Sequence, residues 1–323
     1  MLAALVLSQA GFGGAISQLP TTPRYSRGLH AVTGKVSEAG ACFAGFLEGK
    51  PFTILDLNAN KVLNSEQVYL SGSDSNQMKV LTESQTFHYK DKHLYRGATN
   101  NLAVLASFDS ATHIIGFGPY KGWNGMTAFA EMHPKERGEN SNRLIKVQKT
   151  GKYVMKFFSK LEGNTLHLGI AETKHLSGIW EFRRFEAPLG KGKFRLEKVV
   201  PSKNPRVPAK MKFPGVYPQA VDWKNGAVIF GQGSKATLVT KTKREELPVL
   251  PGSGQVSVFA GLRGRILDWN ASYSGNDASM FEFDRAAKAW KPLGPYALVG
   301  ASASEKRWLL RDSKGAVSLV EFR

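Results

Sequence analysis

The chain has 323 residues, of which 42% are hydrophobic and 22% are charged, with one cysteine and a formal net charge of +18 at pH 7. This composition is that of a soluble globular protein, and it excludes a collagen, a wholly disordered chain and a disulfide-stapled miniprotein. No stretch approaches the roughly 20 consecutive apolar residues of a membrane-spanning helix, so we expect no transmembrane segment.

Residues 1–26 predict a signal segment followed by an N-terminal arm. An apolar run from Leu2 to Leu7 precedes two candidate cleavage points at small residues, Ala10 and Ala15. A positively charged start is missing, and an ordinary N-terminal strand is the alternative. We therefore expect export to the periplasm or the extracellular space, with a cytoplasmic location as the alternative, and a single domain over residues 27–323.

The cysteine, Cys42, lies in an apolar stretch that reads Ala-Gly-Ala-Cys-Phe-Ala-Gly-Phe. A lone cysteine cannot form an internal disulfide, and no other Cys or His stands at the spacing of zinc ligands beside it. Because Cys is among the most buried residue types, we predict a small buried hydrophobic side chain rather than a catalytic thiol.

Short segments with alternating apolar and polar residues dominate the chain. They are rich in β-branched and aromatic side chains and are bounded by turn-forming residues. The clearest are residues 52–57, 67–70, 101–106, 152–157, 165–170, 227–230 and 255–259. No apolar pattern with helical spacing persists for three turns, so the sequence predicts an all-β protein.

Internal similarity recurs at intervals close to multiples of 40 to 50 residues, which is the length of a four-stranded propeller blade. One repeat consists of Ile179–Arg183, Met280–Asp284 and Leu319–Arg323, each with a central glutamate: Glu181, Glu282 and Glu321. Two further repeats contain Trp123, Trp223 and Trp269, and the pair Asn225–Val228 and Lys314–Val317. This periodicity favours a β-propeller over a barrel or a sandwich.

The segment Met280–Leu293 ends an aromatic strand with Asp284, continues through a short polar turn and opens the next strand with Trp290. It resembles the outer hairpin of a kelch-type blade, and Phe52–Val62 is similar to hairpins of bacterial propellers. The paired glycines of the kelch family and the WD40 signature are absent. The resemblance therefore implies the propeller superfold in two or three blades and no specific family.

Dividing residues 27–323 by a period of about 45 residues predicts seven four-stranded blades, with six or eight as alternatives. We expect boundaries near residues 64, 100, 148, 215, 252 and 294. The last segment, Pro295–Arg323, is short, and we expect Leu29–Val36 to complete it and close the ring. The alternative architecture is two β-sandwich domains divided around the proline-rich stretch Pro201–Pro218, which we interpret as a long loop between blades.

The positive charge is concentrated in residues 121–215, which carry 20 Lys and Arg against 8 Asp and Glu, a net +12 of the total +18. Clustered cations raise the local electrostatic potential and favour polyanions. The alternative is a solvated strand face, because much of this run alternates with apolar residues. The predicted polyanion-binding residues are Lys191, Lys193, Arg195, Lys198, Lys203, Arg206, Lys210 and Lys212.

Motifs for nucleotide binding, zinc proteases and serine hydrolases are absent, and we predict neither a cofactor nor a metal site. His88 and His93 flank a hairpin turn, and His133 lies in a polar segment, residues 131–139, that we expect to be a loop. In a propeller enzyme, carboxylates from separate blades would converge; the candidates are Asp109, Asp222 and Asp268.

Two of these carboxylates, Asp222 and Asp268, are each followed directly by a tryptophan, and the two pairs are 46 positions apart. This blade-like repetition favours a structural role for both carboxylates. The tryptophans are likewise predicted to pack between blades rather than to stack on sugars or bases.

The sequence thus predicts an exported β-propeller that acts as a binding or scaffolding module and contacts a protein or glycan partner through one face. One alternative is a propeller glycoside hydrolase or lyase, although an enzyme is the less favoured class. The other alternative is a propeller that binds a polyanion, either acidic polysaccharide or nucleic acid. The residues predict no oligomeric state.

Overall fold

The computed structural model describes residues 12–19, 35–40, 42–46, 52–58, 61–64, 86–90, 93–97, 103–108, 113–119, 126–133, 141–149, 153–173, 179–188, 200–201, 210–214, 218–232, 235–250, 256–271 and 279–323. All regular elements in these ranges are β-strands, which confirms the all-β prediction. Within these ranges there is no helix of the length and apolarity needed to cross a membrane.

Four separate antiparallel sheets are each built from consecutive strands. The first contains β8 (Ala103–Phe108), β9 (His113–Pro119), β10 (Met126–His133) and β11 (Ser141–Lys149). The second contains β12 (Tyr153–Glu162), β13 (Thr165–Thr173), β14 (Ile179–Pro188), β15 (Val200–Pro201) and β16 (Lys210–Pro214). The third contains β17 (Pro218–Asp222), β18 (Ala227–Gln232), β19 (Lys235–Val239) and β20 (Arg244–Leu247). The fourth contains β21 (Val256–Leu262), β22 (Arg265–Ala271), β23 (Ser279–Asp284) and β24 (Ala289–Gly294).

An eight-stranded sheet joins the beginning of the chain to its end. Its first half contains β1 (Ala15–Gln18), β27 (Val317–Glu321), β26 (Arg307–Asp312) and β25 (Tyr296–Ala301). Its second half contains β2 (Lys35–Val36), β3 (Cys42–Phe46), β4 (Phe52–Asp56) and β5 (Lys61–Asn64). The two halves meet where β2 and β25 run parallel, with Lys35 opposite Ala301. A separate hairpin consists of β6 (Thr86–Lys90) and β7 (His93–Gly97).

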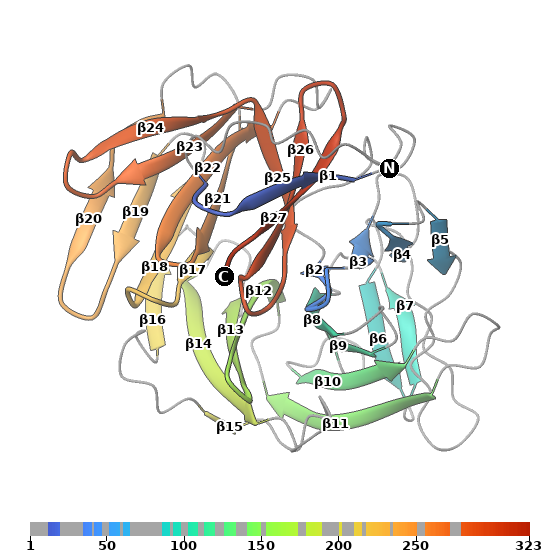
Figure 1. Ribbon diagram of the computed structural model, residues 1–323. Coiled ribbons are helices and arrows are strands. Elements are labelled where there is room, and N and C mark those ends of the chain that lie inside the picture. Colours follow the sequence, from blue (N-terminus) through green and yellow to red (C-terminus); the bar gives the residue numbers. More distant parts are fainter. Residues whose placement is uncertain are drawn as a thin grey trace.

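These sheets form a β-propeller, because their first strands follow one another around a ring (Figure 1). Strand β8 contacts β12, β12 contacts β17, and β17 contacts β21. The ring then continues from β22 and β23 to β25, and β2 contacts both β25 and β8. A ring of small sheets leaves few exposed sheet edges. Because the sheets follow one another in a ring, the alternative of two β-sandwich domains is wrong.

The blade boundaries expected from the sequence agree with the ends of the sheets. Strand β5 ends at Asn64, β11 at Lys149, β16 at Pro214 and β24 at Gly294, and residues 100 and 252 fall between sheets. The count of seven blades is not confirmed. The segment between residues 64 and 100 contributes only β6 and β7 to the described part of the chain; β6 lies beside β9, while β2 and β8 contact each other directly.

Two expectations about individual segments need correction. The fourth strand of the last sheet is β1, in which Ile16 lies opposite Val320, whereas Lys35–Val36, the described part of Leu29–Val36, forms β2 and pairs in parallel with β25. The described part of Pro201–Pro218 is not an inter-blade loop, because Pro201 ends β15 and Lys210–Pro214 form β16, and both strands pair with β14 in the outer part of the same sheet. Proline is tolerated there because an outer strand needs fewer backbone donors than a central one.

The glutamate repeat marks a real structural equivalence, because Glu181, Glu282 and Glu321 all lie on the third strand of their sheets, β14, β23 and β27. Two of them pair with an arginine that opens the second strand. Arg265 lies 2.6 Å from Glu282, and Arg307 lies 2.8 Å from Glu321. The other two repeats place their residues on non-equivalent strands and turns: Asn225–Val228 spans the β17–β18 turn, whereas Lys314–Val317 spans the β26–β27 turn.

Apolar side chains fill the spaces between successive sheets. Ile229 and Leu238 of the third sheet pack with Phe259, Ile266 and Phe283 of the fourth. The third and fourth sheets approach each other closely at Gly261, where an added methyl group would overlap the backbone carbonyl of Val221. Two of the predicted core tryptophans are confirmed as buried, since Trp223 is 7% exposed and Trp308 is fully buried. Trp290 is half-buried against the same cluster, and its Nε1–H donates to the Pro248 carbonyl at 2.7 Å.

Candidate functional site

One face of the propeller carries turns from several sheets, and we call it the turn face. Its inner turns join the first and second strands at residues 163–164, 223–226, 263–264 and 302–306, and its outer turns join the third and fourth strands at 240–243 and 285–288. Inner and outer turns share this face because alternate strand connections lie at the same end of a meander. Contacts between sheets confirm the arrangement: Asn225 Nδ2 donates to the Gly264 carbonyl at 2.9 Å, and Leu161 N–H donates to the Ala303 carbonyl at 2.7 Å.

Asp222 organises the β17–β18 turn. Its buried carboxylate accepts hydrogen bonds from the Asn225 backbone at 3.1 Å and the Asn225 side chain at 2.8 Å. It also pairs with Arg285 of the neighbouring blade at 2.5 Å. All three contacts are structural, which is the role that the sequence analysis favoured for this residue, although the repetition on which it relied is not present.

Asp268 is also buried, but it does not occupy the position equivalent to Asp222. It lies within the second strand, β22, whereas Asp222 ends a first strand, β17. The recurrence of Asp-Trp is therefore not a blade repeat, and this part of the sequence interpretation is wrong. Asp109 lies outside the described residues, so the predicted convergence of the three carboxylates stays a prediction.

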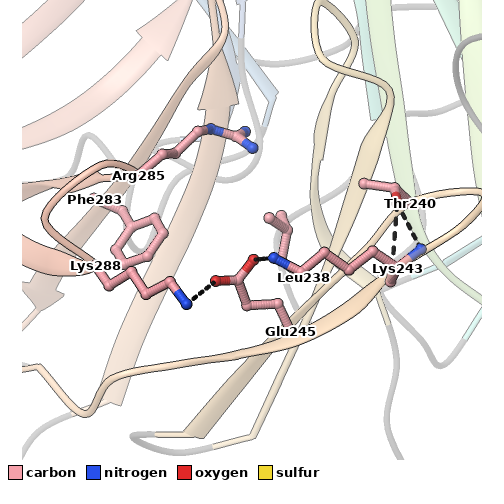
Figure 2. Close-up of a pocket in the computed structure, with 7 residues that line it drawn as sticks. All are labelled: Leu238, Thr240, Lys243, Glu245, Phe283, Arg285 and Lys288. Atoms are coloured by element: carbon pink, nitrogen blue, oxygen red, sulfur yellow. Dashed lines mark hydrogen bonds and ion pairs between the residues drawn. The ribbon is translucent and has the colours of Figure 1, made fainter.

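A pocket opens on the turn face between two outer turns, with a cavity volume of about 250 Å³. It is lined by Leu238, Thr240, Lys243, Glu245, Phe283, Arg285 and Lys288 (Figure 2). The first four residues come from β19, β20 and the turn between them, and the last three come from β23 and the turn that follows. The pocket thus lies across the boundary between the third and fourth sheets.

The charged groups of this pocket are arranged around Glu245. Its Oε2 lies 2.6 Å from Lys243 Nζ, and its Oε1 lies 3.9 Å from Lys288 Nζ. The hydrogen bond from Lys243 holds the pKa of Glu245 below its ordinary value, so the carboxylate is ionised at neutral pH. Thr240 Oγ1 accepts a hydrogen bond from the Lys243 backbone N–H at 3.0 Å and fixes the turn that carries this lysine.

A second charged cluster lies where the β25–β26 loop meets other blades. The Glu305 carboxylate is buried; it accepts a hydrogen bond from Arg263 N–H at 2.6 Å and lies 3.4 Å from Lys160 Nζ. Ser304 N–H donates to Glu38 Oε1 at 3.0 Å. Burial raises the pKa of Glu305 and lowers the pKa of nearby Lys35. The loop is thereby tied to three other blades, and opposite pKa shifts in neighbouring groups are typical of functional sites as well as of structural ion pairs.

A third polar group lies between the second and third sheets. His167 Nε2 is 3.5 Å from Glu162 and its Nδ1 is 3.8 Å from Glu186, while its ring centre lies 6.1 Å from that of Trp223. Burial lowers the pKa of His167, so the imidazole is neutral at pH 7. The sequence reasoning missed this histidine because it sits in an ordinary alternating strand pattern.

The predicted basic run is only partly within the described residues. Lys191, Lys193, Arg195, Lys198, Lys203 and Arg206 lie outside them. Lys210 and Lys212 lie on β16, opposite Arg183 and Glu181 of β14. Pro188, at the end of β14, is opposite Thr165 beside the β12–β13 turn. The chain therefore leaves the second sheet at the turn face immediately before the basic run begins.

Three other histidines named in the sequence analysis lie on strands, which confirms one prediction and corrects another. His88 and His93 lie on the two strands of the β6–β7 hairpin, as expected. His133 is not in a loop, because β10 extends to it and pairs it with Ser141. Among the described residues, no group of three or more metal-binding side chains comes together.

Cys42 is buried, as predicted, and its backbone N–H donates to Ser37 Oγ at 3.1 Å. Burial, with a smaller contribution from Asp56, raises the pKa of its thiol to about 12. Because the thiolate is the reactive form, we expect native Cys42 to react with a thiol reagent such as DTNB at least about 100-fold more slowly than in denatured protein at pH 8. Equal rates in the native and denatured states would contradict this.

No protein-family model matches the chain, and no curated protein matches it. Among solved structures, one chain of the mitotic checkpoint complex is similar with a TM-score of 0.42 and 10% identity, covering 100% of this chain and 96% of that one. Selenomethionine-substituted virginiamycin B lyase from Staphylococcus aureus is similar with a TM-score of 0.39 and 11% identity, covering 95% and 98% of the two chains. Both similarities are low, so what this chain does has to be inferred from its own residues.

Proposed function

We propose that the protein is a binding module that holds an anionic partner, protein or glycan, against its turn face. The supporting observation is the set of cations that project from the described turns. These cationic side chains are all exposed, and they are Lys224, Lys241, Lys243, Arg285, Lys288 and Lys306. A face of one sign raises the local concentration of oppositely charged partners and speeds their association.

The acidic residues of the same turns offset this charge only in part. Asp222 and Glu305 are buried and face into the protein. Asp284 accepts hydrogen bonds from the backbone of Ala286 and Ala287, at 2.9 and 3.0 Å, within its own turn. The exposed part of these turns is therefore predominantly basic.

In the proposal, the first part of the basic run, from Lys191 to Arg206, extends this surface. The position of Pro188 at the turn face supports this, because the chain enters the run from there, whereas Lys210 and Lys212 on β16 lie toward the other end of β14. The same surface would serve an acidic protein, an acidic polysaccharide or a nucleic acid, and salt dependence is common to all three.

Reversing two charges of the run tests the proposal. Lys193→Glu combined with Arg195→Glu should leave the melting temperature unchanged and weaken heparin binding about tenfold at fixed salt, because two attractions become repulsions. Retention on a heparin column measures this as elution at lower salt.

The matched control is Lys235→Glu combined with Lys314→Glu, which makes the same charge change at exposed positions on the opposite face. Its retention should fall much less. Unchanged retention of the Lys193/Arg195 variant would mean that the run is only a solvated face and contributes nothing to the binding surface.

We also propose that the protein is exported after cleavage of its N-terminal segment. Cleavage after Ala10 would keep Phe12, which is 4% exposed in the core, whereas cleavage after Ala15 would remove it. We therefore favour the earlier site, and the N-terminal residue of the mature protein distinguishes the two.

For the ring, the direct contact between β2 and β8 supports six blades, with residues 65–100 as an insertion that carries β6 and β7.

A further inference from the structure

The pocket between the outer turns offers three kinds of contact at once. Leu238 and Phe283, which are 4% and 5% exposed, form an apolar base. Lys243, Arg285 and Lys288 supply positive charge, and Glu245 supplies a hydrogen-bond acceptor that remains ionised. Figure 2 shows the Lys243 and Lys288 side chains reaching the Glu245 carboxylate from opposite sides.

The charge balance of the pocket favours an anion. Arg285 is committed to the buried carboxylate of Asp222 at 2.5 Å. The two lysines share the single carboxylate of Glu245, so one positive charge is left without a counter-charge in the pocket. Their side chains are 61% and 71% exposed and can therefore turn toward a ligand without leaving the surface.

We infer that this pocket binds one acidic sugar unit, a uronate residue of a glycan; this deepens the proposed function and rests on it. The carboxylate of a uronate would accept charge-assisted hydrogen bonds from the ammonium groups of Lys243 and Lys288. A ring hydroxyl would donate to Glu245, and the C–H face of the ring would lie on Phe283. A cavity of about 250 Å³ suits a single sugar ring, because it is smaller than the pockets that bury drug-sized molecules.

Glu245 is the residue that separates a uronate from DNA. The DNA backbone offers no hydrogen-bond donor to this carboxylate, and its phosphates would be repelled by it, whereas a sugar hydroxyl satisfies it. The three contacts together therefore fit a ligand that carries both a carboxylate and hydroxyl groups.

Binding of a defined trigalacturonate to the full chain, measured by calorimetry at low salt, tests the inference. Lys243→Gln combined with Lys288→Gln should weaken binding about 10- to 100-fold, since each charge-assisted hydrogen bond lost contributes to affinity. Both side chains are exposed, so the melting temperature should be unchanged. The control pair Lys235→Gln and Lys314→Gln should bind as the wild type does, and the methyl-esterified trisaccharide should bind at least about tenfold more weakly.

The outcomes separate this inference from the proposed function. Trigalacturonate binding that is insensitive to the Lys243/Lys288 change, with heparin binding intact, overturns the pocket and leaves the turn face as the binding surface. Loss of single-stranded DNA binding in the same variant, with no trigalacturonate binding in the wild type, identifies a nucleic acid as the occupant and also overturns it. If neither heparin nor trigalacturonate binds, the inference and the proposed function both fail.

Discussion

Replacing Trp308 by alanine should lower the free energy of unfolding by about 3–5 kcal/mol, the usual cost of deleting a large buried aromatic side chain. Trp308 is fully buried on β26, and its ring centre lies 4.6 Å from that of Phe322 and 6.5 Å from that of Phe12. The cavity would therefore open where both chain ends meet the last sheet. Denaturant unfolding followed by circular dichroism measures the loss.

Two further variants make the Trp308 result specific. Trp308→Phe keeps an aromatic ring and should cost much less than Trp308→Ala. Val249→Ala removes a side chain that is 54% exposed and should change the stability by no more than about 0.5 kcal/mol. Equal losses in Trp308→Ala and Val249→Ala would mean that Trp308 is not part of the core.

Glu305→Ala should also destabilise the protein at pH 7 by about 3–5 kcal/mol, because removing one partner of a buried ion pair leaves the other without compensation. Lys160 would lose its carboxylate at 3.4 Å, and Arg263 N–H would lose its acceptor at 2.6 Å. Glu305→Gln keeps an acceptor oxygen for Arg263 and should cost less. A Glu305→Ala variant as stable as the wild type would show that the β25–β26 loop does not depend on this carboxylate.

The pH dependence of the same residue has a definite sign. Because burial raises the pKa of Glu305 in the folded protein, the unfolded chain releases this proton first as the pH rises. The contribution of this raised pKa to stability belongs to the protonated carboxyl; it is fully present below about pH 4.5 and decreases as the pH rises through the raised folded pKa, because burial of the ionised group costs more than its partners return. The stability of the wild type relative to Glu305→Gln should therefore be greatest in acid and decline toward neutral pH.

Local sequence patterns predicted the blade boundaries well, because each boundary depends on nearby turn residues. Gly294 with Pro295, and Pro214 with Gly215, interrupt strands whatever lies elsewhere in the chain. The third-strand glutamates were recognised for a related reason, since the strand recurs in three sheets and its ion pair with an arginine recurs in two of them. Burial of Cys42 followed from residue type, and burial of Trp308 followed from residue type and the blade-like spacing of the tryptophans.

Features that depend on contacts between blades were not predictable in the same way. Asp222 and Asp268 share a dipeptide, but only the pairing of strands shows that they belong to different positions. The pocket residues Lys243 and Lys288 lie in separate outer turns, and nothing in either turn indicates that both reach Glu245. Leu29–Val36 was expected to complete the short last segment, and β1 was not recognised because its pairing with β27 joins distant parts of the chain and leaves no local signal.

The pairing of β1 with β27 also bears on how the chain folds. Ser17 bonds to the Leu319 carbonyl, a contact between residues 302 positions apart. Loop-closure entropy makes such a contact slow to form, and the other sheets can form from neighbouring segments before it. During synthesis, β1 has to wait until β27 has left the ribosome. Until the two strands pair, the last sheet is three-stranded, and chaperones or a second molecule can occupy its exposed edge.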